Sequence, residues 1–188
     1  MQRREFLRLS AVATAGILLS AHTPYRQWTI YRKRYLLILT SKTDAPTFRL
    51  GGRVAAVLAA HLPTSRARVV RAPHTARIAS LISTKQMDVA ILSRVDAEKL
   101  LAGQAPFAGY GTVALRSIVA LGDYLLICRA DFPDRHAFLV ASTLVARRSE
   151  LPLAVSVGDS GKVPVHPGAR AYANGRPLPK KAKSDNGK

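Results

Sequence analysis

Cysteine is almost absent from this sequence: Cys128 is the only one among 188 residues. A single thiol excludes an internal disulfide, and it excludes metal or redox sites built from several cysteines. Cys128 lies within the apolar segment Tyr124-Leu-Leu-Ile-Cys-Arg129. We therefore expect a buried thiol with a structural role.

The patterns of common catalytic and metal sites are missing as well. No two of the five histidines stand at the HxxxH or HxH spacing that lets a pair bind one metal ion; they are His22, His61, His74, His136 and His166. No GxSxG nucleophile elbow and no GxxxxGKS/T phosphate loop occurs. Gly51-Gly52 lacks the other glycines of a dinucleotide fingerprint. We expect a non-catalytic protein without a metal or a cofactor.

Acidic residues are scarce: 11 Asp and Glu face 29 Lys and Arg, giving a net charge of +18. Much of the excess lies at the two ends of the chain, because residues 35–175 hold 17 basic and 9 acidic residues. This central region is still basic enough to favour anionic ligands or acidic partners. It has no basic stripe with interleaved aromatic residues, so we do not expect nucleic-acid binding.

Long apolar runs are missing beyond residues 9–20, a stretch too short to cross a bilayer of about 30 Å as a helix. With its basic head, this stretch predicts a bacterial export signal over residues 1–23; an ordinary amphipathic helix is the alternative. Arg3, Arg4, Phe6 and Leu7 resemble the core of a twin-arginine signal, which exports folded proteins. We expect a periplasmic protein. An uncleaved signal would tether it to the inner membrane.

The chain after the signal divides by composition. Residues 24–34 carry aromatic and basic side chains and are predicted to form a linker at a membrane interface or an arm packed on the domain. Residues 35–175 form the predicted domain. Residues 176–188 are rich in lysine, lack large apolar side chains after Leu178, and are predicted to be a disordered tail.

Hydrophobic periodicity within the domain alternates between that of strands and that of helices. Strands are predicted at 35–40, 67–71, 87–93, 117–121 and 124–129. Helices are predicted at 48–62, 75–83, 96–102 and 134–148, with Thr75 as an N-cap. This alternation predicts an α/β fold with a mostly parallel sheet flanked by helices.

Three predicted loops follow strands, and ligands of open parallel sheets bind where strands end. Each loop combines hydroxyl groups with a cationic or imidazole side chain; the predicted ligand-binding residues are Thr40, Ser41, Lys42, Thr43, His74, Thr75, Ser93 and Arg94. Hydroxyl and amide donors beside Lys42 or Arg94 suit a carboxylate. The alternative is that these are ordinary loop and capping residues.

Four segments in order resemble the TAXI family of TRAP-transporter solute-binding proteins. They are 50–58 (Leu-Gly-Gly-Arg-Val-Ala-Ala-Val-Leu), 75–92, 115–130, and 164–172 with Pro-Val-His-Pro-Gly-Ala. The last segment also fits a plain turn in which His166 accepts a backbone hydrogen bond. Members of the family are two-lobed receptors that close around a small solute, usually a carboxylate, and pass it to a membrane transporter.

The chain departs from that family after residues 129–133, where it passes directly to a helix resembling one near the family's C-terminal end. The resemblance therefore implies one lobe of a periplasmic-binding-protein-like fold. The expected function is non-catalytic binding of a small anionic solute, with a TRAP membrane subunit as a partner. The alternative is a periplasmic accessory protein that has lost the solute and covers its exposed apolar surface with another protein.

Overall fold

The computed structural model describes residues 34–180. The contacts between residues divide the chain into two units, with the boundary between Arg34 and Tyr35. The predicted export signal, with Arg3, Arg4, Phe6 and Leu7, lies outside the described residues. So do residues 24–33 of the predicted linker and 181–188 of the predicted tail. Within the rest of the tail, the Arg176 N–H donates to the Ala171 carbonyl, and the Pro179 carbonyl accepts a bond from Arg135.

The predicted strands and helices are all present, with boundaries within three residues of those expected. The strands are β1 (Leu37–Ser41), β2 (Arg68–Ala72), β3 (Val89–Ser93), β4 (Leu115–Leu121), β5 (Tyr124–Arg129) and β6 (Val155–Ser156). The helices are α3 (Ala45–His61), α4 (Thr75–Ser83), α5 (Arg94–Ala102), α6 (Asp134–Ala146) and α7 (Pro167–Ala173). The short strand β6 was not predicted.

The strands form one six-stranded sheet in the order β2-β1-β3-β5-β4-β6. The prediction of a mostly parallel sheet is wrong, because only the pairs β1·β2 and β1·β3 are parallel and the other three are antiparallel. The reason is the two-residue turn Gly122-Asp123, with Gly122 at φ +59°, which joins β4 and β5 as a hairpin. Because β5 is antiparallel to both neighbours, β1 to β4 still run in one direction and end at one edge.

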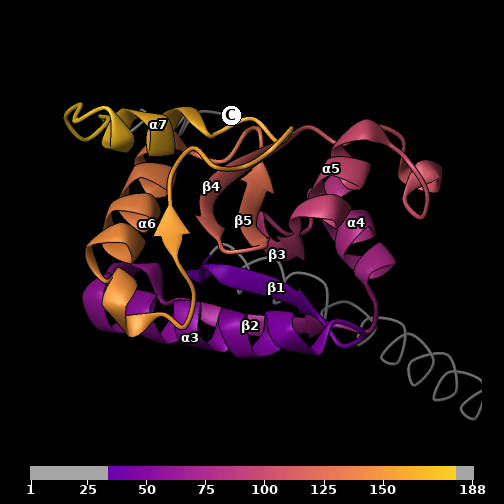
Figure 1. The fold of residues 1–188 in the computed structure, drawn as a ribbon, viewed down its shortest axis with the longest axis horizontal. Coiled ribbons are helices and arrows are strands. Elements are labelled where there is room, and N and C mark those ends of the chain that lie inside the picture. Colours follow the sequence, from indigo (N-terminus) through magenta and orange to yellow (C-terminus); the bar gives the residue numbers. More distant parts are fainter. Residues whose placement is uncertain (1–33, 181–188) are drawn as a thin grey trace, which may run out of the picture. The chain divides into compact units, whose positions relative to one another are not determined.

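Helices cover both faces of this sheet, as Figure 1 shows for α6 on one side and α4 and α5 on the other. Alternate strand residues point to opposite faces: Ile38 packs in the cluster with α3 and α6, and Leu39 in the cluster with α4 and α5. Cys128 is fully buried, which confirms its prediction, and burial raises the pKa of its thiol. The thiol is therefore protonated at neutral pH.

Large exposed apolar side chains are few among the described residues, namely Val95, Tyr110, Leu153 and Leu178. They lie in different segments. The bare apolar face expected for an isolated lobe is therefore not present in the described domain, because α3 and α6 on one side and α4 and α5 on the other bury the sheet. No helix among residues 34–180 is both long and apolar enough to cross a membrane.

The segment around His166 is a structural corner, which confirms the interpretation of a plain turn. His166 is fully buried: its Nδ1 accepts the Gly168 N–H at 3.1 Å, and its Nε2 lies 2.8 Å from the Phe132 carbonyl oxygen. A Cβ atom on Gly168 would collide with the backbone of Asp134. The Pro-Gly pair after His166 thus allows α7 to approach the start of α6.

Candidate functional site

The carboxyl ends of β1, β2 and β3 place two of the three predicted loops in direct contact. The Ser41 and Thr43 hydroxyl oxygens are 2.8 Å apart, and the Thr43 N–H donates to Ser41 Oγ at 3.2 Å. Thr75 Oγ1, after β2, donates to the same Ser41 oxygen at 3.5 Å. We call these three residues the hydroxyl cluster. It arises because parallel strands end at the same edge.

Two other predicted residues of the first loop have different surroundings. Thr40 is fully buried, and its hydroxyl donates to the Val70 carbonyl oxygen at 3.0 Å, so it joins β1 to β2. Lys42 is exposed, and its ammonium group has no ion pair in the described part of the chain. Lys42 is therefore the cation of this loop that is free to meet a ligand.

The second loop differs from the prediction at its helix cap. His74 is the N-cap of α4: its backbone is extended, and its Nδ1 accepts the Arg77 N–H at 3.2 Å. The predicted cap, Thr75, is wrong by one residue. Thr75 is the first helical residue, and its hydroxyl is directed to Ser41 instead. The imidazole of His74 thus has a structural role.

The third loop has its polar groups engaged elsewhere. Ser93 Oγ accepts the Asp96 N–H at 3.1 Å as the N-cap of α5. The Arg94 guanidinium is 2.9 Å from Asp159 Oδ1 and also donates to the Gly122 carbonyl oxygen at 3.3 Å. The Arg94 charge is therefore compensated by Asp159. Its side chain bonds the β4–β5 turn, and no hydrogen bond joins it to the hydroxyl cluster.

Two residues that the sequence analysis did not select, Asp44 and Tyr124, lie between the first and third loops. Burial, and next the negative charge of Asp96, raises the pKa of the Asp44 carboxyl, and the Tyr124 hydroxyl interacts with it. Burial, and next the charge of Asp44, raises the pKa of Tyr124. Tyr124 pairs with Ser93 across β3 and β5. The hairpin turn at 122–123 is the sequence signal that could have placed Tyr124 here.

The edge therefore has two electrostatic sides. Lys42 presents a cation on the side of β1 and β2. Beside it, the hydroxyl cluster has one free hydroxyl proton, because its internal bonds use the proton of Thr75 and that of either Ser41 or Thr43. Asp44 and Asp96 present negative charge toward β3 and β5, and their mutual repulsion contributes to the raised pKa of Asp44. No group of three or more His, Cys, Asp or Glu residues within 34–180 is arranged to hold a metal ion.

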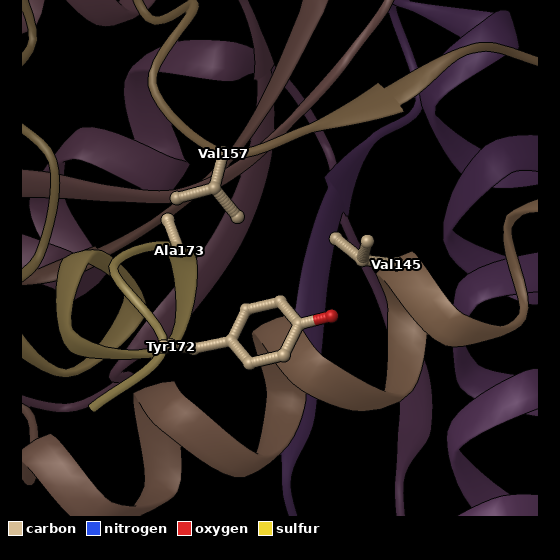
Figure 2. A pocket seen from close by; sticks show the side chains of 5 residues that line it. Val145, Val157, Tyr172 and Ala173 are labelled. Atoms are coloured by element: carbon tan, nitrogen blue, oxygen red, sulfur yellow. The ribbon is translucent and has the colours of Figure 1, made fainter. Parts of the chain in front are cut away.

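Two cavities among the described residues lie away from this edge. One of about 350 Å³ is lined by Val145, Val157, Tyr172, Ala173 and Gly175. Figure 2 shows the Tyr172 ring extending from α7 toward α6, where it also packs edge-on against Phe138. The second, of about 540 Å³, lies beside the start of β2. Neither contains a predicted ligand-binding residue.

No protein-family model matches the chain, and no curated protein is detectably similar to it.

Proposed function

We propose that this protein is an exported, non-catalytic, single-lobe relative of the TAXI solute-binding proteins, and that it holds a small carboxylate-bearing solute at the carboxyl edge of its sheet. The observation that carries the proposal is the hydroxyl cluster of Ser41, Thr43 and Thr75, which brings two separate loops together beside Lys42. The expected location is the periplasm, with a TRAP membrane subunit as the recipient of the solute.

The chemistry of the edge suits one carboxylate. The one hydroxyl proton that the cluster leaves free and the free backbone N–H groups at the start of α4 donate hydrogen bonds, and Lys42 supplies the opposite charge. Asp44 and Asp96 would repel a second carboxylate placed toward β3. The solute therefore carries its carboxylate near Lys42 and presents a donor group, such as a hydroxyl or an ammonium, to Asp44. Affinity is expected to be weak, because one lobe leaves the solute open to water.

Isothermal titration of the full chain with a panel of monocarboxylates, dicarboxylates and amino acids tests this function. Lys42→Gln should weaken binding of the best solute about fivefold, as expected for an exposed ion pair worth up to about 1 kcal/mol. The matched control is Lys85→Gln, which removes an exposed lysine just past the C-terminal end of α4, away from the hydroxyl cluster, and should leave affinity unchanged. The absence of heat with every solute, from a protein that is folded by circular dichroism, would exclude the proposal.

A second candidate is an accessory protein that has kept the fold without the solute. It is favoured by the Arg94–Asp159 pair, which compensates the charge of the third loop's cation, and by the next residue, Val95, which is 60% exposed. A partner protein that binds this part of the surface would bury Val95 in the interface. Light scattering after size exclusion distinguishes the two candidates. A complex that dissociates to a monomer in Val95→Glu supports the accessory role, and a monomer in both proteins opposes it.

A further inference from the structure

The strand β2 forms one edge of the sheet and, within the described residues, pairs only with β1. The Arg68 N–H donates to the Leu36 carbonyl at 2.9 Å, and the Ala72 carbonyl accepts the Lys42 N–H at 2.9 Å. Even-numbered residues of β2 therefore bond to β1. In a parallel ladder, alternate residues bond on opposite sides. The N–H and C=O groups of Val69 and Arg71 consequently point away from the sheet.

Two arginines flank this free edge, one on each face of the sheet. The Arg68 guanidinium carbon lies 5.1 Å from the ring centre of Tyr35, and that of Arg71 lies 4.2 Å from the ring centre of Phe48. Both arginine residues are exposed. An arginine stacked on a ring keeps its N–H groups available for a carboxylate, and it loses less freedom on binding because the ring already orients it.

The surroundings of β2 are basic. Residues 35–83 contain seven Lys and Arg residues and only one acidic residue, Asp44. None of those seven basic residues forms an ion pair within the described part of the chain. The cavity of about 540 Å³ opens beside the start of β2, and Arg66 and Arg68 are among its described lining residues. The edge therefore combines free backbone groups, uncompensated positive charge and room for a side chain.

We propose that the outer edge of β2 binds an acidic, extended segment of a partner protein as an added β-strand. The backbone of that segment bonds to Val69 and Arg71, and two acidic side chains three residues apart meet Arg68 and Arg71 on opposite faces. A second copy of this chain is a poor occupant, because pairing two β2 strands would place arginines close together. This surface is separate from the carboxyl edge, so the proposal does not depend on solute binding.

A capped peptide of sequence Thr-Val-Glu-Thr-Val-Glu-Thr-Val tests this directly with the full chain. Bound peptide should slow hydrogen exchange at the amides of Val69 and Arg71, followed by NMR. Replacing both glutamates of the peptide with glutamine should weaken binding at least tenfold, since two exposed ion pairs are lost. Two further peptides are N-methylated at one or the other set of alternate residues. The peptide whose methylated amides face β2 should not bind, because its ladder bonds cannot form.

Variants of the protein supply the complementary test. Arg68→Gln and Arg71→Gln should each raise the Kd of the glutamate peptide about fivefold, while Arg170→Gln, on the exposed side of α7, should leave it unchanged. If a variant does not fold, the comparison of the glutamate and glutamine peptides on the unmodified chain still tests the proposal.

Three results would overturn the proposal. In the first, the arginines only protect the edge from aggregation, and the glutamate peptide leaves the exchange of both amides unchanged. In the second, both N-methylated peptides bind as well as the unmodified one, which would indicate charge attraction without strand addition. In the third, light scattering reveals a dimer whose formation protects Val69 and Arg71, which would make a second copy the occupant.

Discussion

The imidazole of His166 has both nitrogen atoms in use, which fixes its tautomer. Nδ1 accepts the Gly168 N–H, so the ring proton is on Nε2 and is donated to the Phe132 carbonyl oxygen. Asp134 Oδ1 lies 3.7 Å from Nδ1, but this nitrogen is an acceptor and the contact is not an ion pair in the neutral ring. Burial, the largest cause, lowers the pKa of His166.

This arrangement predicts a pH-dependent contribution to stability. The folded-state pKa lies below the unfolded value of about 6.5, so the contribution is complete above pH 6.5 and declines as the pH falls and the unfolded chain takes up the proton. His166→Ala should lower the free energy of unfolding in two ways. Loss of the helix cap costs about 1 kcal/mol, and the Phe132 carbonyl left without a hydrogen bond costs about 1–3 kcal/mol. Urea unfolding of the parent chain and the variant at pH 7.5 and 5.5 should show that the substitution lowers the free energy of unfolding less at pH 5.5.

Ser142→Ala on α6 provides the control, because it removes a side-chain hydrogen bond but no titratable group, and its effect should not vary with pH in this way. Equal losses at both pH values for His166→Ala would show that the ring is protonated without cost in the folded protein. Such a result would contradict the neutral tautomer.

At the scale of elements, the two adjacent glycines of α3 have opposite environments. A Cβ atom on Gly51 would lie 2.6 Å from Thr40 Cγ2 and 3.0 Å from Val69 Cγ2, whereas one on Gly52 would meet nothing within 4 Å. Gly51 is buried against β1 and β2 and lets the helix approach the sheet. Gly52 has no such role. Substitutions at these two adjacent positions therefore distinguish the effect of close packing on stability from the effect of helix propensity.

Alanine substitutions should therefore shift stability in opposite directions. Gly51→Ala should destabilise the protein, because overpacking costs about 1–3 kcal/mol, more than the gain in helix propensity. Gly52→Ala should stabilise it by about 0.5–1 kcal/mol, because alanine loses less backbone entropy in a helix. Thermal unfolding followed by circular dichroism compares both with the parent chain. An increase in Tm for Gly51→Ala would show that α3 does not pack this closely on the sheet.

Sequence periodicity was sufficient for most elements because buried strands and amphipathic helices alternate clearly through residues 35–148. It was insufficient for strand direction, because alternating strands and helices favour a parallel sheet, whereas the two-residue turn at Gly122-Asp123 joins β4 and β5 as an antiparallel hairpin. Loop residues were placed correctly at strand ends. Their partners were not predictable, because Arg94 meets Asp159 from 65 positions away and Asp44 meets Tyr124 only through the antiparallel pairing of β3 with β5.

At the scale of the whole domain, burial rather than charge explains how a domain built on one sheet can be stable by itself. Two apolar clusters lie on opposite faces of a single sheet, and α3, α6, α4 and α5 cover them. The described residues hold scattered exposed apolar side chains and no bare sheet face. A domain of about 150 residues buries enough of its surface to be stable by itself.

Residues 35–180 expressed alone should therefore fold as a cooperative unit. Urea transitions followed by far-UV and near-UV circular dichroism should coincide, as two-state unfolding requires. A dye that fluoresces on binding exposed apolar surface should show little fluorescence in the absence of urea. Separate transitions, or strong dye fluorescence in buffer, would describe a collapsed chain without fixed packing. Such a chain would need a partner or a second lobe to complete its core, and both edges proposed here as binding surfaces would then lack a rigid support.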